Sequence, residues 1–212
     1  MKQTAEIIGE LGPFPGIAAI HGLTWDGHRV WFGSDSGLHA LDPRSGAILR
    51  SFAMPADAGT AFDGRHLFQI AEDRIRKIDP ESGEVLATIP APGGGGDSGM
   101  AWAEGSLWIG RYRERTIHQV DPETGKVLRT IASDRFVTGV TWVEGELWHG
   151  IWEGEESGLR RIDPDSGAVL DQLDLPGGIG VSGLEAGGAD RFFCGGGPSG
   201  RVRVVRRPQR AG

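Results

Sequence analysis

Two histidines of this sequence, His21 and His149, are the first candidates for chemistry. Imidazole titrates near neutral pH, so either side chain could act as a general acid or a general base. Each could instead be a structural histidine whose ring is held by hydrogen bonds. A metal site built on the two histidines is a further alternative, but the sequence offers no convincing carboxylate to complete the ligand set. We predict that His21 or His149 acts in acid–base catalysis and that the site holds no metal and no cofactor.

Glu185 differs in residue type from the equivalent positions of the other repeat copies. It takes a position in a repeated pattern where the other copies have small residues, namely Thr24, Ala61, Ala101 and Thr141. A buried carboxylate there is costly unless it is paired or neutralised, and burial would raise its pKa. We predict that Glu185 is the acid or orienting group of a pocket, with space left open by the small Ala186 and by three glycines at 195–197. The alternative is a local shift of the strand that carries Glu185 to solvent.

Several further side chains could bind a substrate. Arg111 and Arg113 could hold an anionic group with their forked donors, or pair with Glu114 or Glu153 as solvated loop residues. Asp97 follows four glycines and could point at a ligand or form a turn. The predicted substrate-binding residues are Asp97, Ser98, Arg111, Arg113, Thr138, Trp152, Glu153 and Ser182.

The elements that must position these residues are copies of one repeat. Its text is Gly-Leu-x-Trp-Asp-Gly, then Leu-Trp or a close variant, then Asp-Pro-x-Ser/Thr-Gly, and a damaged fifth copy runs over 183–195. The leading glycines are 37, 40, 40 and 44 residues apart, at Gly22, Gly59, Gly99, Gly139 and Gly183. The Asp-Gly and Asp-Pro segments are turn formers, so each copy divides into four short antiparallel strands. That pattern is typical of a β-propeller blade.

The fifth copy has only three expected strands, at 183–186, 191–194 and 201–205. The N-terminal stretch 5–15 resembles the outer strands of the other copies, so we expect it to supply the fourth strand. Completing the last blade in this way closes the ring of blades and removes an open sheet edge. We predict an all-β, five-bladed β-propeller with four antiparallel strands per blade, as a single domain over 1–212. The expected blades cover 16–55, 56–92, 93–133, 134–176, and 177–208 together with 4–15.

Eight aromatic residues recur at two positions of the repeat. A ring that stacks on a cofactor would not need to recur in every blade, whereas packing between blades does need it. We therefore interpret as core the residues Trp25, Phe62, Trp102, Trp142, Trp31, Phe68, Trp108 and Trp148.

Function is expected where the copies differ, because loops on a rigid frame are where sites usually form. The distance from leading glycine to Asp-Pro is 20 residues in the first two copies, then 22 and 24, and the additions fall at 111–115 and 151–158. These loops and the links between blades open on one face. Trp152, the one tryptophan outside the repeat positions, could stack on a ligand there or anchor its loop. The residues expected to surround the channel mouth are His21, Ala58, Ser98, Thr138 and Ser182.

Composition limits the remaining alternatives. The 212 residues include 36 glycines and carry a net charge of −7, which suits an all-β domain with tight turns and weighs against a nucleic-acid partner. The single cysteine, Cys194, permits no internal disulfide and is expected to be a small buried residue rather than a nucleophile. The N-terminus lacks the apolar stretch of a signal peptide, and no run approaches the roughly 18–20 apolar residues of a membrane span. We predict a cytoplasmic protein with a small-molecule ligand and no membrane partner.

The repeat text resembles, over nearly the whole chain, the superfamily of plant- and bacterial-type glutaminyl cyclotransferases, streptogramin lyases and YncE-like propellers. Glutaminyl cyclotransferases have five blades, and their first blade carries Thr-Glu-Gly-Leu, whose Glu is implicated in proton transfer. The matching stretch here is Ile20-His21-Gly22-Leu23, so the resemblance implies that His21 is a different base at the same place. Streptogramin lyases are similar in their Trp-Phe strand text but have seven blades and a metal-linked histidine without a secure counterpart here.

These observations predict a small-molecule-binding enzyme of the cyclase, lyase or hydrolase type, with its site at the channel mouth. The alternative is a non-catalytic propeller that binds a ligand or another protein. An enzyme requires a concave pocket with convergent polar groups, whereas a scaffold requires a flat or plugged mouth and an exposed apolar rim.

Overall fold

Tight turns reverse the chain direction between the short strands of each repeat. In the four Asp-Pro turns the glycine N–H donates to the carbonyl of the aspartate four residues earlier, at 2.8–2.9 Å. These glycines have φ values of 73–77°, a left-handed conformation that glycine adopts without steric cost. Each repeat therefore folds into an antiparallel sheet.

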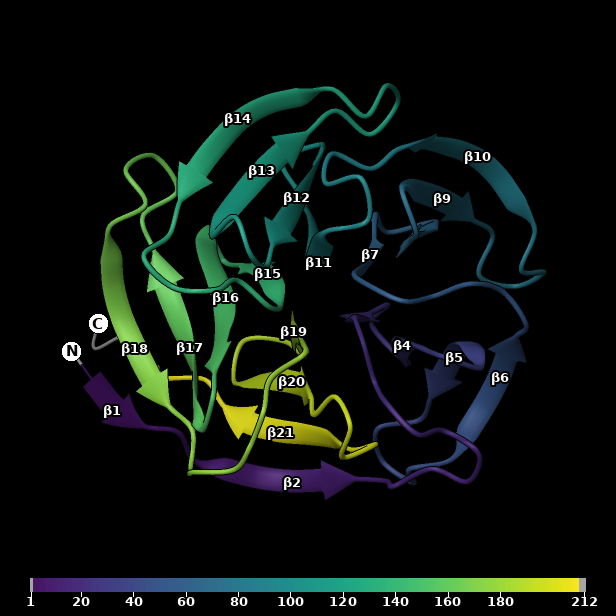
Figure 1. Ribbon diagram of the computed structural model, residues 1–212. Coiled ribbons are helices and arrows are strands. Elements are labelled where there is room, and N and C mark those ends of the chain that lie inside the picture. Colours follow the sequence, from purple (N-terminus) through teal and green to yellow (C-terminus); the bar gives the residue numbers. More distant parts are fainter. Residues whose placement is uncertain (1, 210–212) are drawn as a thin grey trace.

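The computed structural model describes residues 2–209 and is a five-bladed β-propeller, as predicted (Figure 1). Blade one contains β3 (Leu23–Trp25), β4 (Val30–Ser34), β5 (Gly37–Leu41) and β6 (Ile48–Phe52). Blade two contains β7 (Thr60–Phe62), β8 (Leu67–Ala71), β9 (Arg74–Ile78) and β10 (Val85–Pro90). Blade three contains β11 (Asp97–Ala103), β12 (Ser106–Arg111), β13 (Thr116–Val120) and β14 (Val127–Ala132). Blade four contains β15 (Val140–Val143), β16 (Glu146–Glu153), β17 (Glu156–Ile162) and β18 (Val169–Asp174).

Blade five is assembled from both ends of the chain. It contains β19 (Gly183–Ala186), β20 (Arg191–Gly195), β21 (Val202–Arg206) and, as its outer strand, β2 (Ile7–Leu11). β2 pairs antiparallel with β21, with Ile7 opposite Val205 and Leu11 opposite Val202. This confirms the predicted closure by an N-terminal strand. A short strand β1 (Lys2–Thr4), which the repeat pattern does not predict, adds in parallel to the outer edge of β18.

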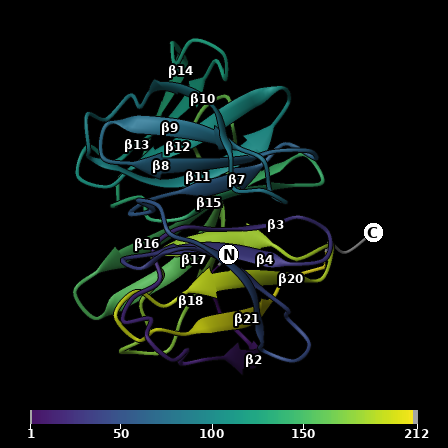
Figure 2. The same cartoon turned by 90° about the vertical axis from the view of Figure 1, so that its right-hand side faces the viewer.

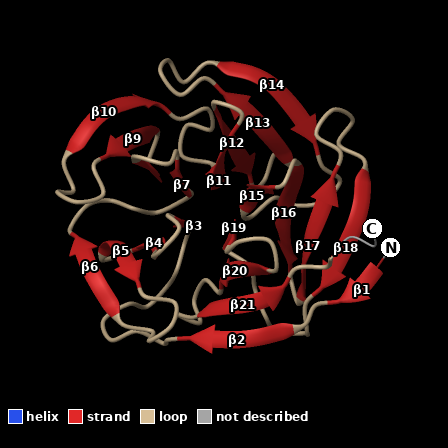
Figure 3. Ribbon diagram, turned by 180° about the vertical axis from the view of Figure 1, so that it is seen from behind, coloured by secondary structure: helices blue, strands red, loops and turns tan. Residues whose placement is uncertain are grey.

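The innermost strands pack backbone against backbone around the centre of the propeller, as both face views show (Figures 1 and 3). A Cβ atom on any leading glycine would lie within 2.7 Å of the backbone of the next blade, and the last glycine meets the first blade. No side chain fits there, which explains the strict recurrence of Gly22, Gly59, Gly99, Gly139 and Gly183.

The recurring aromatics pack between neighbouring blades, as predicted. Phe68 of blade two stacks on Trp102 of blade three at 5.6 Å between ring centroids, and Trp108 meets Trp142 at 5.1 Å across the next boundary. Blade five differs, because Ala186 stands at the aromatic position. Phe192 fills that place and contacts Trp148 at 5.0 Å, so the open space expected beside Ala186 is absent.

The blades form a disc seen from its side in Figure 2, where β14 and β2 lie at opposite ends of the view, as they do in Figure 1. Among residues 2–209, no helix has the length and apolarity to cross a membrane.

Candidate functional site

A pocket of about 300 Å³ opens at the mouth of the central channel. It includes every residue that directly precedes a leading glycine, as expected from the repeat alignment. The lining residues are His21, Asp57, Ala58, Asp97, Ser98, Tyr112, Thr138, Trp152 and Ser182.

The inner strands fix these residues by backbone hydrogen bonds just beyond the regular ladder. The N–H groups of His21, Thr138 and Ser182 donate to the carbonyls of Gly33, Gly150 and Gly195 at 2.7–3.0 Å. These three blades thus each hold one residue at the mouth from the same position of the repeat, and residues of the variable loops complete the wall.

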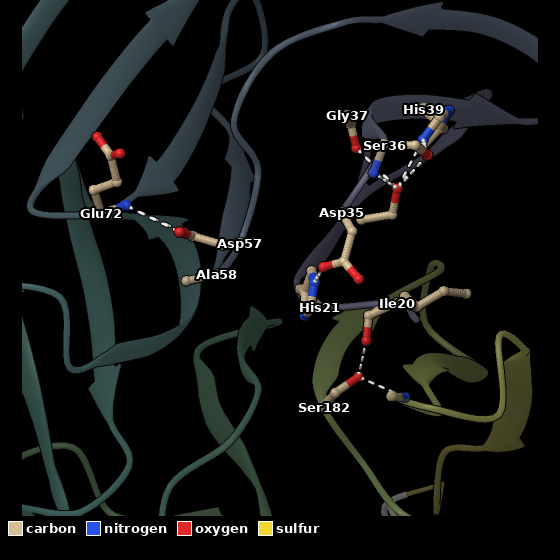
Figure 4. Close-up of polar contacts among 12 residues, drawn as sticks. Ile20, His21, Asp35, Ser36, Gly37, His39, Asp57, Ala58, Glu72 and Ser182 are labelled. Atoms are coloured by element: carbon tan, nitrogen blue, oxygen red, sulfur yellow. Dashed lines mark hydrogen bonds and ion pairs between the residues drawn. The ribbon is translucent and has the colours of Figure 1, made fainter. Parts of the chain in front are cut away.

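His21 is in contact with a carboxylate beside the pocket. Its Nε2 lies 2.8 Å from Oδ1 of Asp35, which is on the turn between β4 and β5 (Figure 4). The His21 side chain is 27% exposed and that of Asp35 is 72% exposed. Ser34 and Ser36 both contact Nε2 of the buried His39, which fixes the turn. The turn therefore holds Asp35 in place, and Asp35 orients the His21 imidazole, which stays partly exposed.

Of the three hydroxyl residues that directly precede a leading glycine, two connect neighbouring blades. Ser98 donates to the carbonyl of Val137 at 2.8 Å, and Ser182 donates to the carbonyl of Ile20 at 2.6 Å. Thr138 occupies the same repeat position, is 4% exposed, and has no hydrogen-bond partner for Oγ1 within the described chain. A Cβ on Gly150 would lie 2.4 Å from this oxygen, so the Thr138 hydroxyl is covered by the strand beside it, whereas the two serines bond the next blade.

Asp97 places a carboxylate at the mouth on blade three. Its Oδ2 accepts the N–H of Gly93 at 2.9 Å, and its buried Oδ1 has no partner among residues 2–209. Burial raises the pKa of Asp97, an effect opposed by the Gly93 hydrogen bond and the charge of Arg111. A Cβ on Gly93 would collide with the carboxylate, so the glycine run lets the loop fold back over Asp97.

Two lining residues were missed from the sequence. Asp57 precedes a leading glycine by two positions, as Asp97 does, and this shared position is the signal that could have found it. Its carboxylate accepts the N–H of Glu72 at 3.2 Å (Figure 4). Tyr112, the single tyrosine of the chain, lies in the extended loop between the two arginines that were singled out. Its hydroxyl donates to the carbonyl of Trp152 at 3.1 Å.

Trp152 both lines the pocket and anchors its loop. Its Nε1 donates to the carbonyl of Gly154 at 3.1 Å. A Cβ on Gly180 would collide with the indole, and one on Gly197 would lie 3.1 Å from it. The two glycines leave room for the aromatic wall on the side of blades four and five.

Glu185 lies inside the channel and does not line the pocket. Thr24 and Thr141 donate to its two carboxylate oxygens at 2.7 and 2.5 Å, and the N–H of Ala186 donates at 2.8 Å. Burial raises its pKa to about 7 despite these hydrogen bonds. Glu185 pairs with Phe193 as Thr141 pairs with Trp148, so the strand is not shifted toward solvent. The extra residue of this copy is taken up in the turn after Ala186.

His149 is also absent from the pocket. It is fully buried in β16, with Nδ1 3.1 Å from the carbonyl of Gly150 and no partner for Nε2 in the described chain. Burial lowers its pKa to about 4. The structure therefore does not place it where it could exchange protons with a ligand in this pocket.

The remaining predicted residues, Arg111, Arg113 and Glu153, are not among the residues that line the pocket. Arg111 pairs with Glu114 at 3.0 Å, and Arg113 is exposed. Glu153 accepts the N–H of Phe136 at 2.7 Å and pairs with Arg135 at 3.0 Å, and these contacts stabilise the loop. Burial raises the pKa of the Cys194 thiol to about 12. Within residues 2–209, no three His, Cys, Asp or Glu side chains form a cluster that could hold a metal ion.

Comparisons with known proteins agree with this architecture. The family model described as outer membrane protein assembly factor BamB matches residues 71–207. No curated protein matches the chain. Similar solved structures include glutaminyl cyclase from Myxococcus xanthus, with 17% identity, 97% of each chain covered and a TM-score of 0.79.

Two further structures align over smaller shares. A protein of unknown function from Bacteroides caccae is 14% identical over 79% of this chain and 65% of that chain, with a TM-score of 0.56. Hydrazine synthase from Kuenenia stuttgartiensis is 17% identical over 81% of this chain and 52% of that chain, with a TM-score of 0.51. At these identities the likeness shows the fold, and it confirms the resemblance to glutaminyl cyclotransferase-type propellers at that level.

Proposed function

Since the chain belongs to the family described as outer membrane protein assembly factor BamB, its blades are a shared scaffold, and we propose that its own activity resides at the channel mouth. There it acts as a small-molecule enzyme of the cyclase, lyase or hydrolase type. His21 is the base, and Asp97, Ser98, Thr138, Trp152 and Ser182 form the walls that hold the substrate.

The His21–Asp35 contact is the observation that carries this proposal. Nε2 can donate to Asp35 at 2.8 Å, and in that tautomer of the neutral ring Nδ1 carries no proton. Nδ1 can then take a proton from a substrate nucleophile or from water, and the resulting imidazolium can return it to the leaving group. The negative charge of Asp35 stabilises that imidazolium.

The other two candidates for acid–base chemistry do not line the pocket, and this supports the role of His21. His149 is fully buried, and the carboxylate of Glu185 is occupied by the two threonines inside the channel. Among the described lining residues, His21 carries the one imidazole, the type of side chain best suited to act as a base at neutral pH.

The likeness to a glutaminyl cyclase structure selects the first substrate to assay. Ammonia release from peptides with an N-terminal glutamine is measured beside a panel of small amides, esters and lactones. For the substrate that turns over, His21→Ala should lower kcat/KM by at least about 100-fold, the usual contribution of a general base. Asp35→Asn should cause a smaller loss.

Two variants make this assay decisive. His28→Ala changes an exposed histidine in the hairpin turn after β3 and should leave turnover unchanged. His21→Glu installs the residue that glutaminyl cyclotransferases carry at the matching position, and it should retain more cyclisation activity than His21→Ala. Full activity in His21→Ala would overturn the proposal.

A protein-interaction role is the second candidate, and the outer strands favour it. Exposed leucines recur after the Asp-Pro turns, with Leu49, Leu86 and Leu128 exposed by 57%, 47% and 52%. Together with the assembly factor named by the family description, this apolar rim fits a scaffold. Failure of the whole panel, with no ligand bound at the channel mouth, would favour this candidate.

A further inference from the structure

We infer that blade one carries a second reactive site, in which Ser51 is a nucleophile for the acyl group of an apolar carboxylic ester and His39 is its base. The site is separate from the channel mouth, because neither residue lines that pocket. Both line a different cavity, of about 460 Å³, together with the loop at 14–17 that leads from β2 to β3. This volume lies within the usual range of small-molecule pockets.

A hydroxyl and an imidazole lie side by side in this cavity. Ser51 on β6 is directly opposite His39 on β5, and its Oγ lies 2.8 Å from Nδ1 of the histidine. That distance is within the range expected for a nucleophile and its base. Ser51 is exposed, whereas His39 is 5% exposed and packs against Phe32 at 5.2 Å between ring centroids. Packing therefore holds the base in place, and the hydroxyl is open to a reactant.

A second hydroxyl, on the other side of the ring, can set the tautomer that the reaction needs. Oγ of Ser34 lies 2.9 Å from Nε2 of His39 and can donate to the carbonyl of Gly37 at 3.3 Å. When Ser34 donates to that carbonyl, it can accept the proton of Nε2–H, and in that tautomer Nδ1 is unprotonated and faces Ser51. Oγ of Ser36 lies 3.1 Å from Nε2 on the same side (Figure 4). Hydroxyl groups thus orient one nitrogen of the ring while the other can take a proton.

The other blades show that the fold does not require this pair. At the position of His39, blades two, four and five carry Arg76, Arg160 and Arg203, which cannot accept a proton. Blade three carries His118, whose Nδ1 lies 2.8 Å from Oγ1 of Thr130. Within the described chain, His118 has no hydroxyl at Nε2, and neither residue of that pair lines the cavity. Of the described blades, blade one alone combines the pair with the second hydroxyl and the cavity.

The wall of the cavity indicates the class of acyl group. Beside the reactive pair it consists largely of the apolar side chains of Phe14, Pro15, Ile17 and Ile48. None of the described lining residues is a lysine, an arginine, an aspartate or a glutamate. A charged acyl chain would lose its hydration here without gaining a partner, whereas an alkyl chain gains free energy by leaving water. The cavity therefore suits an ester of an apolar acid.

The reaction consists of two steps that need no cofactor. Oγ of Ser51 attacks the carbonyl carbon of the ester while its proton passes to Nδ1 of His39, and the imidazolium then gives this proton to the departing alcohol. The acyl group is now bound to Ser51. In the second step a water molecule attacks the acyl carbon and loses a proton to Nδ1, and Ser51 leaves with that proton. One ester and one water give one acid and one alcohol.

The test treats the protein with p-nitrophenyl butyrate, stops the reaction with acid and locates the butyryl group by peptide mass spectrometry. We expect the butyryl group on Ser51, and Ser51→Ala should abolish this labelling. His39→Gln keeps a polar side chain that cannot act as a base at neutral pH, and it should slow the labelling by at least about 100-fold. p-Nitrophenyl acetate should react about 5-fold more slowly than the butyrate, because its shorter chain buries less apolar surface.

Two controls identify the site of the reaction. Repeating the measurement in His21→Ala removes the proposed base of the channel mouth, so labelling of Ser51 in that variant is independent of the first site. Thr130→Ser gives blade three a histidine–serine pair without the cavity and the second hydroxyl. Position 130 of that variant should be acylated at least about 10-fold more slowly than Ser51.

A pH profile of the wild-type protein tests the base without any substitution. Burial lowers the pKa of His39 below its usual value of 6.5, so its imidazole is neutral above that pH. The labelling rate should therefore level off above pH 6.5, whereas an unassisted hydroxyl would react faster with every further rise in pH. A rate that keeps rising, a butyryl group found only on other residues, unchanged labelling in His39→Gln, or equal labelling of position 130 in Thr130→Ser would overturn the inference.

Discussion

Oγ1 of Thr24 donates to Oε2 of Glu185 at 2.7 Å, although the two residues are 161 positions apart in the sequence. Thr141 donates to the other carboxylate oxygen at 2.5 Å. One carboxyl group thus joins blades one, four and five inside the channel, beside the seam where the propeller closes. Because burial raises its pKa to about 7, this contact couples ring closure to pH.

Replacing Glu185 should remove one component of the pH dependence of stability. A carboxyl group with a raised folded-state pKa stabilises the fold below its unfolded value of 4.5, and that stability is lost as pH rises through about 7. Glu185→Gln should remove this contribution to the pH dependence, which is worth no more than about 3 kcal/mol because one pKa unit corresponds to about 1.4 kcal/mol. Denaturant unfolding between pH 4.5 and about pH 8 measures it, and an unchanged slope in the variant would contradict the assignment.

His149 should contribute the opposite slope. Its pKa is lowered from 6.5 to about 4, so its contribution to stability is present above 6.5 and is lost as pH falls toward 4. His149→Ile installs the residue that blade three carries as Ile109 and should make the protein less sensitive to acid. Since the windows of Glu185 and His149 overlap with opposite signs, the wild-type profile should be flatter than that of either variant. A steeper acid loss in His149→Ile than in wild type would refute this.

Adding one methyl group at a leading glycine should disrupt the ring of inner strands. In Gly139→Ala the new Cβ would collide with the backbone of Leu184 in the next blade. We expect a loss of at least about 2 kcal/mol in the free energy of unfolding, in the range of overpacked cores. Gly177→Ala, where nothing lies near the added Cβ, is the matched control and should be close to neutral. Thermal and denaturant unfolding of the two variants provide the comparison.

Phe192 should be essential because it replaces the aromatic residue that blade five lacks. It contacts Trp148 at 5.0 Å and is fully buried beside Ala186. Phe192→Ala should cost about 3–5 kcal/mol in the free energy of unfolding, the usual loss for a buried phenylalanine. The comparison variant is Phe52→Ala, which changes a partly buried outer-strand residue stacked on Trp31 and should cost less. Denaturant unfolding measures both, and a larger loss in Phe52→Ala would show that the boundary between blades four and five does not depend on Phe192.

The propeller could be predicted from the amino-acid sequence, because the residues that form its turns are local and repeated. Glycine and Asp-Pro turns occur at nearly constant spacing, and each aromatic position recurs with the blade, so the number of blades and the closing N-terminal strand could be predicted. The same alignment placed His21, Ala58, Ser98, Thr138 and Ser182 together at the mouth, since equivalent positions of a closed ring lie at the same height.

Which polar side chains form hydrogen bonds and which do not could not be predicted, because it depends on the three-dimensional packing of the blades. Glu185 and His149 stand out in the sequence, yet threonines from two other blades surround Glu185, and packing between blades buries His149. Ser98 and Thr138 are equivalent in the repeat, but of these two described residues Ser98 alone bonds the next blade. Such differences arise from contacts between residues far apart in the chain, where small changes in packing decide whether a hydrogen bond forms. No pattern within a single repeat contains that information.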